Sequence, residues 1–290
     1  MKIVKVLGGL GNQMFQFALY KALEKQFPEE RVLLDLHCFN GYPLHHGFEI
    51  RRIFGANYEQ ANWVDVSKVA WPYPNYLSWR IGSRLLPNRK TMLIESRLFT
   101  YESQVLKNPT IQYYDGYWQH EEYFKSIRQD ILKVFRFPKL QDERNKLLAQ
   151  NIQSHQTLSI HVRRGDYTSN SLYKDICTTD YYRQAISKML TECHPDLICI
   201  FSDDIPWCKG HLETMIKDIS HEYVDWNNDG HYYIDMQLMS LCHHHIIANS
   251  SFSWWGAWLC ESPDQRVYAP RKWINREGFH SPVLRNWILI

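Results

Sequence analysis

Two adjacent arginines, Arg163 and Arg164, give the sequence its clearest chemical signal. They stand in residues 161–167 (HVRRGDY), with His161 two positions before the pair and Asp166 two positions after it. The planar guanidinium fork of arginine matches the oxygens of a diphosphate. The preceding residues are predicted to form a strand, and open α/β sheets bind ligands at the carboxyl ends of their strands. We therefore prefer a ligand-binding cluster to a surface strand end with ion pairs.

Polar residues also follow two later predicted strands. Asp203 and Asp204 could hold ribose hydroxyls or a metal, or could cap the helix expected from residue 205, and we leave both interpretations open. Residues 249–256 (NSSFSWWG) place serines at a helix start, which could bind an anion or simply cap the helix. Asp235 lies in an otherwise apolar helix. Its carboxylate could accept from a guanine base, but its position alone favours an acid in a first helical turn.

The glycines at residues 8–13 (GGLGNQ) resemble the first turn of a dinucleotide-binding fold. They follow a short strand pattern, and Asp35 ends the next predicted strand, as does the acid that binds an NAD ribose. However, Met14 stands where the fingerprint requires Gly or Ala. The fingerprint is partial, and an NAD-dependent oxidoreductase remains an alternative.

The hydrophobic periodicity predicts an α/β protein with parallel sheets. A strand, helix and strand are expected at 2–7, 12–26 and 31–36, the middle from 38 to 108 is hard to interpret, and 113–118 suggests a strand that ends at a site. Helices are expected at 121–135 and 138–154. The second half alternates strands at 158–162, 197–201, 222–225, 246–249 and 267–269 with helices at 179–191, 205–217, 232–242 and 252–260. We therefore expect two Rossmann-like domains, 1–154 and 155–290, facing each other across a cleft.

Composition excludes several classes. The 290 residues are 44% hydrophobic with a net charge of +2, so neither a disordered chain nor a nucleic-acid-binding surface is indicated. The seven cysteines are irregularly spaced, which argues against disulfides and zinc. Adjacent histidines at 45–46 and 243–245 cannot converge on a metal from a strand.

Localisation is predicted from the absence of targeting patterns. No leader peptide and no uncharged run of about 18 residues is present, so we expect a cytoplasmic protein, at most peripheral to the inner membrane. Residues 71–90 contain aromatic and basic residues but no acid. We prefer a surface loop with a short helix there to a face that meets an acceptor or an anionic membrane.

Taken together, these stretches resemble the bacterial α-1,2-fucosyltransferases, in the family that includes the histo-blood-group H-type enzymes. The similar stretches run from residue 8 to residue 259: GGLGNQMFQFA, GFEIRRIF, GYWQHEEYF, HVRRGDY, FSDD and the segment from Asp235 to Leu259. The resemblance implies a GT-B-like fold. It also implies transfer of L-fucose from GDP-β-L-fucose to the 2-hydroxyl of a galactose with inversion, with neither metal nor cofactor.

The resemblance also implies roles for individual residues. On the donor side it implies that Arg163 binds the diphosphate and that Arg164 and Asp166 support the loop or contact the fucose. His161 and Asp235 would contact guanine, and Asp203 would contact the ribose or the base. Ser251 and Ser253 would be phosphate ligands, with Phe252 beside them. The first domain would receive the acceptor, with Asp115, Trp118 and Gln119 near it, and Asn12 would contact the donor sugar or the acceptor. The general base stays open among Glu49, Asp115 and Asp166.

The acceptor also stays open. Lactose-like glycans, lipid-linked O-antigen repeats and Galβ1,3GalNAc termini all fit, and a lipid-linked acceptor would bring the protein near the membrane. A third hypothesis is a non-catalytic sugar- or nucleotide-binding module, which the aromatic content of 14% permits.

Overall fold

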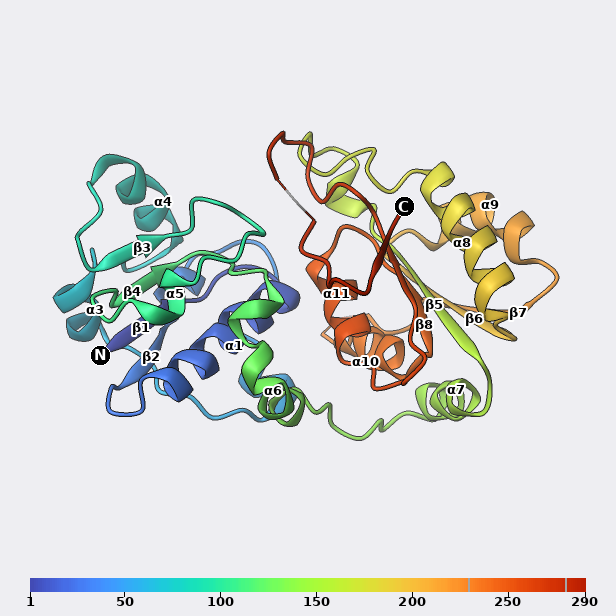
Figure 1. Cartoon of the computed structure of the whole chain (residues 1–290), viewed down its shortest axis with the longest axis horizontal. Helices are drawn as coiled ribbons and strands as arrows, with labels where there is room; N and C mark the ends of the chain where they lie inside the picture. Colours follow the sequence, from blue (N-terminus) through green and yellow to red (C-terminus); the bar gives the residue numbers. More distant parts are fainter. Residues whose placement is uncertain (229, 280) are drawn as a thin grey trace. The chain divides into compact units, whose positions relative to one another are not determined.

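A computed structural model describes residues 1–228, 230–279 and 281–290 (Figure 1). Contacts divide the chain into two compact units, Met1–Pro138 and Lys139–Ile290. The division falls earlier than the boundary expected near residue 154. The reason is that α7 (Glu143–Ser154) packs Leu148 and Ile152 against α10 (Tyr233–Leu241) of the second unit. No helix among the described residues is long and apolar enough to cross a membrane.

The first unit is built on a parallel sheet, which the described residues form in the order β2-β1-β4-β3. The strands are β1 (Lys2–Lys5), β2 (Val32–Asp35), β3 (Met92–Ile94) and β4 (Tyr113–Asp115). Helix α1 (Leu10–Gln26) connects β1 to β2, so the predicted strand–helix–strand unit is confirmed.

Two buried glutamines of α1 fix the loops around the glycine turn. Gln13 donates to the carbonyls of Gly8 (2.9 Å) and Gly47 (2.7 Å). Gln16 accepts from the Leu7 N–H (3.1 Å) and donates to the Gly116 carbonyl (2.9 Å). The amide side chains thus satisfy main-chain groups that burial would otherwise leave unpaired.

The middle of the first unit, which the sequence left unassigned, contains short helices. They are η1 (His37–Phe39), α2 (Ile50–Phe54), α3 (Trp63–Val69), α4 (Tyr76–Leu85) and α5 (Gln104–Lys107). The continuous helix expected over 121–135 is wrong: η2 (Glu121–Tyr123) and η3 (Lys125–Ile127) precede α6 (Arg128–Val134). Phe124 leaves helical geometry at φ −134° and buries its ring 6.1 Å from that of Phe15.

The second unit contains a parallel sheet in the order β10-β9-β8-β5-β6-β7. Its strands are β5 (Thr157–Val162), β6 (Leu197–Ser202), β7 (Ser220–Val224), β8 (His244–Ile246), β9 (Val267–Ala269) and β10 (Ile288–Leu289). The strand predicted over 246–249 is misplaced. Beyond β8 the chain turns, because the Ser250 N–H bonds to the Ala248 carbonyl (2.8 Å).

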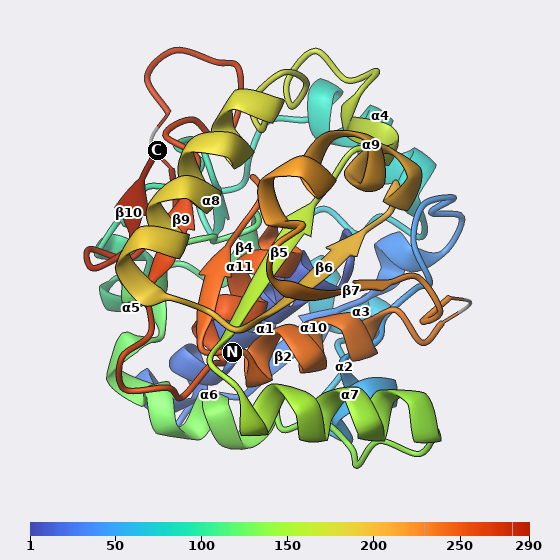
Figure 2. The same cartoon turned by 90° about the vertical axis from the view of Figure 1, so that its right-hand side faces the viewer.

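Helices cover both faces of this sheet, as the alternating pattern predicted (Figure 2). Helices α8 (Thr179–Cys193) and α9 (Ile205–Ile216) pack on Ile160 and Ile198. On the opposite face, α7 and α10 (Tyr233–Leu241) pack on Cys199 and Phe201. Helix α11 (Ser251–Trp258) follows β8. The register pairs His161 with Phe201, so His161 belongs to the face that carries α10.

Candidate functional site

The arginine pair lies immediately beyond β5, where it was predicted. Arg163 forms ion pairs with Asp166 and, at 3.1 Å between Nη1 and Oδ2, with Asp203. The other oxygen of Asp203 accepts the main-chain N–H of Arg164 (2.8 Å). A Cβ on Gly165 would lie 2.7 Å from the Asp203 carboxylate, so any larger residue here would displace that carboxylate. One acid after β6 therefore holds both the Arg163 side chain and the loop that carries it.

Asp204 has a different task from Asp203. It accepts the Trp207 N–H (3.1 Å) and so caps α9, and it accepts Arg164 Nε (3.0 Å). The hydrogen bond from Arg164 lowers the pKa of this carboxyl. The Arg164 guanidinium also lies 4.5 Å from the centre of the Trp207 ring. The described residues contain no group of three His, Cys, Asp or Glu that could hold a metal ion.

His161 lies at the end of β5 with a buried imidazole, 6% exposed. Burial lowers its pKa to about 3, so the ring is neutral at physiological pH. Its Nδ1 has no hydrogen-bond partner among the described residues. The Phe252 ring lies 5.8 Å from the His161 ring and 5.9 Å from that of Tyr232, which precedes α10. An unsatisfied ring nitrogen beside aromatic faces is suited to a planar polar ligand.

The start of α11 lies close to residues 163–167 after β5, which we call the arginine loop. Ser250, rather than Ser251, caps the helix by accepting the Phe252 N–H (3.3 Å). Ser253 is buried and its hydroxyl donates to the Ser250 carbonyl (3.4 Å). Tyr167, from the arginine loop, donates to the Asn249 carbonyl (3.3 Å). The two loops that follow β5 and β8 are therefore directly linked.

Asp235 is held by a buried amide network. It accepts from Asn227 (2.8 Å), and Asn227 in turn bonds to Asn145 of α7 (2.7 Å). Desolvation raises the pKa of Asp235 to about 7, and the bond from Asn227 opposes that rise. A ligand that donates hydrogen bonds to the ionised carboxylate would stabilise that form and lower this pKa.

In the first unit, Asn12 and Gln119 come together. Gln119 Nε2 donates to Asn12 Oδ1 (2.6 Å), which ties the first turn of α1 to the loop after β4. Gly8 has φ +98°, and the His45 ring lies 3.1 Å from where a Cβ on Gly9 would be. Trp118, with φ +56°, is buried, and its Nε1 has no partner among the described residues.

Glu49 and Asp115, two of the expected acids, are already engaged. Glu49 is buried, its carboxylate pairs with Arg52, and its N–H donates to Gln13 (2.8 Å). Asp115 forms an ion pair with Lys5 and accepts Trp79 Nε1 (3.1 Å). The structure does not bring these two carboxylates to an accessible position.

Glu95, which sequence reasoning missed, follows β3. Its carboxylate accepts the N–H groups of Tyr117 (2.7 Å) and Trp118 (3.2 Å) and is half-buried. Desolvation nevertheless raises its pKa to about 7. Asn227, Asn145 and Tyr232 were missed as well. Asn227 could have been found by inspecting the loop after β7 for polar residues, as was done for β5, β6 and β8.

The comparisons with known proteins give the family. The model of Glycosyl transferase family 11 matches residues 96–290. The chain is 31% identical to the alpha-1,2-colitosyltransferase of Escherichia coli, over 99% of this chain and 98% of that one. It is also 31% identical to the O-antigen biosynthesis glycosyltransferase WbnK of E. coli, over 97% of each. The human galactoside alpha-(1,2)-fucosyltransferase 1 is 24% identical, over 87% of this chain and 63% of that one.

Solved structures agree on the fold. The crystal structure of POFUT1 in complex with GDP-fucose resembles the chain with a TM-score of 0.50 and 14% identity, over 92% of this chain and 97% of that one. At that identity the likeness concerns the fold alone, which is α/β and GT-B-like. The chain belongs to glycosyl transferase family 11.

Proposed function

We propose that this chain is a galactoside α-1,2-fucosyltransferase of glycan or O-antigen synthesis. It transfers L-fucose from GDP-β-L-fucose to the 2-hydroxyl of a terminal galactose, with inversion and without a metal. The observation that carries the proposal is the arginine loop after β5, held by Asp203 and Asp204 and linked to the start of α11. Its location is the sheet edge at which α/β folds bind ligands.

The arginine loop would stabilise the leaving diphosphate. Breaking the anomeric C–O bond places negative charge on the diphosphate, and preorganised donors lower such a barrier by about 3–4 kcal/mol each. The exposed Asp166 carboxylate and a phosphate oxygen would make the same kind of bond to Arg163. We therefore expect the donor to replace Asp166 on Arg163, while Asp203 keeps the guanidinium oriented.

Guanine would be recognised by Asp235 and His161. Guanine presents N1–H and N2–H₂ side by side, two donors for one carboxylate. The raised pKa of Asp235 and the unpartnered Nδ1 of His161 both support a ligand there. Asn227 is a positioning residue in this account, because it holds the carboxylate in one orientation. Phe252 would provide an aromatic contact, and Ser251 and Ser253, in the first turn of α11, would bind the phosphates.

Glu95 is our candidate for the general base that takes the proton from the acceptor hydroxyl. An efficient base has a pKa near the working pH, and burial raises the pKa of Glu95 to about 7 although the residue is not fully enclosed. Glu49 and Asp115 are held in ion pairs. Asn12, Trp118 and Gln119 would lie on the acceptor side of the same unit.

A second candidate donor comes from the colitosyltransferase relative. Colitose is the 3-deoxy form of L-fucose, so a GDP-colitose donor would use the same guanine and diphosphate contacts. The two candidates therefore differ only in the pocket for the sugar.

Donor and acceptor are tested together by incubating the protein with lactose and either GDP-fucose, GDP-colitose or GDP-mannose, with and without EDTA. We expect an α-1,2-fucosylated product from GDP-fucose, identified by NMR, in equal yield with EDTA. A product from GDP-colitose alone would select the second candidate. A yield abolished by EDTA would contradict the metal-independent mechanism.

A further inference from the structure

We propose that α4 and the turn after it bind an anionic lipid bilayer, lying in the plane of its surface. The inference does not depend on which sugar is transferred. It concerns residues 71–90, for which a surface loop with a short helix was expected, and that local structure is confirmed by α4.

Helix α4 has two different faces. Leu77, Ile81 and Leu85 follow one another at four-residue spacing, which places them in one stripe along the helix. They are 62%, 51% and 75% exposed. Leu86, after the helix, is 41% exposed. An apolar stripe of this kind on a surface helix is exposed to water only at a cost in free energy.

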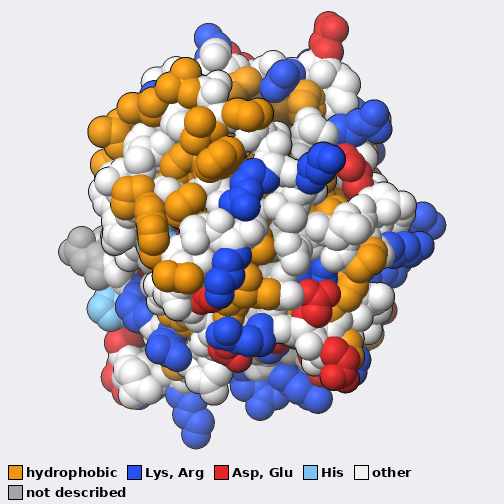
Figure 3. Space-filling view, turned by 90° about the vertical axis from the view of Figure 1, so that its left-hand side faces the viewer, with side chains coloured by type: hydrophobic (Ala, Val, Ile, Leu, Met, Phe, Trp, Pro, Cys, Tyr) orange, Lys and Arg blue, Asp and Glu red, His pale blue; other side chains and the backbone are white. Residues whose placement is uncertain are grey.

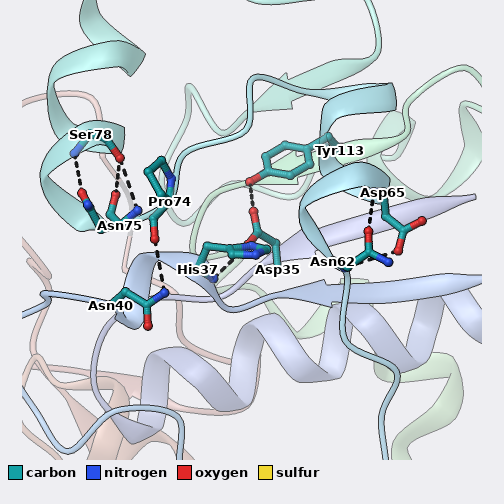
Figure 4. A network of polar contacts seen from close by, with 9 residues as sticks. All are labelled: Asp35, His37, Asn40, Asn62, Asp65, Pro74, Asn75, Ser78 and Tyr113. Carbon is teal, nitrogen blue, oxygen red and sulfur yellow. Dashed lines mark hydrogen bonds and ion pairs between the residues drawn. The ribbon is translucent and has the colours of Figure 1, made fainter.

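The opposite face of α4 is anchored to the sheet. Trp79 donates its Nε1–H to Asp115 at the end of β4, and Lys5 Nζ lies 3.6 Å above its ring. The helix start is capped by Asn75 and Ser78, and Asn40 Nδ2 donates to the Pro74 carbonyl (3.2 Å), as Figure 4 shows. Because these contacts fix the orientation of the helix, the stripe cannot rotate inward.

The following turn is anchored as well. Arg89 donates to the carbonyls of Ser67 in α3 (2.7 Å) and of Ala70 directly after it (2.8 Å). Trp71 donates to the Pro87 carbonyl (2.7 Å). Because these hydrogen bonds hold the segment in place, Leu85 and Leu86 remain exposed at the surface.

The positive charge of residues 71–90 favours an anionic partner. Arg80 and Arg84 are adjacent to the apolar stripe on the helix, are exposed, and form no ion pair among the described residues. Residues 71–90 contain no Asp or Glu. Figure 3 shows hydrophobic side chains gathered over the upper part of one face, with Lys and Arg beside them. A second copy of the chain on this face would bring like charges together, whereas anionic headgroups complement them.

The length of α4 fits a helix that lies on a membrane. Ten residues extend about 15 Å, half of the hydrocarbon thickness that a spanning helix must cross. A short helix with an apolar stripe and flanking arginines is the pattern of an interfacial anchor.

The test is sedimentation of the full chain with vesicles of phosphatidylcholine, with or without phosphatidylglycerol. We expect binding only when phosphatidylglycerol is present, weaker in high salt. Leu77→Gln with Ile81→Gln should weaken it at least tenfold, and Arg80→Gln with Arg84→Gln on the order of 30-fold. Leu147→Gln is the matched control, an exposed leucine of α7 (59% exposed) that should bind as the unchanged protein does. Circular dichroism and the thermal shift with GDP confirm that each variant is folded.

Three results would overturn the proposal. The first is no binding to either vesicle. The second is binding that the Leu77 and Ile81 substitutions leave unchanged, since charge alone would then suffice. The third is a concentration-dependent dimer in sedimentation velocity that the same substitutions abolish, which would assign the stripe to a second copy.

Discussion

The carboxyl ends of the two sheets offer the same place in the fold but are used differently. In the first unit, charged side chains at this edge are paired: Lys5 pairs with Asp115, and Asp35 accepts from Tyr113 (2.6 Å) and contacts His37 (2.7 Å; Figure 4). In the second unit, the arginine loop is partly exposed and His161 Nδ1 is unpartnered among the described residues. The edge with unsatisfied and solvent-accessible groups is the one suited to a charged ligand.

The pKa shifts follow the same division, with one exception. The hydrogen bond to Asp35 raises the pKa of His37, and the pKa of Asp35 is lowered although burial opposes this, so this pair is stable as an ion pair. Asp235, in the second unit, has its pKa raised by burial. Glu95 is the exception in the first unit, because its pKa is raised despite two main-chain hydrogen bonds. This raised pKa is the reason that we propose Glu95 as the general base.

The largest expected effect is on stability and concerns Lys5. Lys5→Met leaves the Asp115 carboxylate buried without its cation, and breaking a buried ion pair costs about 3–5 kcal/mol. Urea denaturation measures this loss. Arg164→Met, at the second edge, should cost far less, because its ion pair with Asp204 is partly exposed. Equal losses would break the distinction between the edges.

Arg163→Lys should lower kcat by about 10²–10³, because a point charge cannot replace the guanidinium fork at the diphosphate. Steady-state kinetics with GDP-fucose measure the effect. Arg183→Lys, an exposed arginine of α8 paired with Asp180, is the control and should leave kcat unchanged. Near-normal turnover of Arg163→Lys would remove the proposed role.

Glu95→Gln should lower kcat by about 10² at pH 8, since general-base catalysis contributes at least that much. With a pKa of about 7, Glu95 is ionised above pH 7, so the kcat of the unchanged protein should fall as the pH drops below 7. The variant should lose that dependence. Glutamine can still accept the Tyr117 N–H, so the loop should stay folded. Glu122→Gln, at a partly exposed residue paired with Lys125, is the control. If Glu95→Gln kept the fall of kcat at low pH, that fall would belong to another group.

Asn227→Ala should weaken GDP binding about tenfold, because Asp235 loses the donor that orients it. Its neighbour Asn228→Ala is the control, since Asn228 donates to the Asp225 carbonyl (3.2 Å) instead of to Asp235 among the described residues. Calorimetry over a range of pH adds a sharper readout. GDP should bind the ionised Asp235, so affinity falls as the pH drops through about 7, and Asn227→Ala should move that midpoint upward. An unchanged midpoint would leave Asn227 with a structural role alone.

The comparison of the edges also explains what the sequence could predict. Strands β5 and β6 of the second sheet are six residues long and regular, so their ends, and with them Arg163 and Asp203, could be located from periodicity. Glu95 could not, because β3 spans three half-buried residues in a segment of short helices. Pairings such as Gln119 with Asn12 are 107 residues apart in sequence and depend on tertiary structure.

The structure gives contacts for Asp203 and Asp204, whereas ribose or metal binding by these acids stays a prediction. Asp204 caps α9 and Asp203 holds Arg163, a division of labour that two adjacent acids do not reveal in sequence. Likewise, the partial dinucleotide fingerprint gains no support. The first turn of α1 is bound to Gln119 and covered by His45 in this structure.

The central claim is that the second unit carries a guanosine diphosphate site. It is tested most directly by thermal unfolding with GDP, GDP-fucose, UDP or NAD, each with and without EDTA. A ligand at 100 times its Kd adds about 2.7 kcal/mol of stability, which is readily measured. The account predicts a raised Tm with the two guanosine diphosphates alone, unchanged by EDTA and lost in Asp235→Ala. A raised Tm with NAD and none with GDP would contradict it.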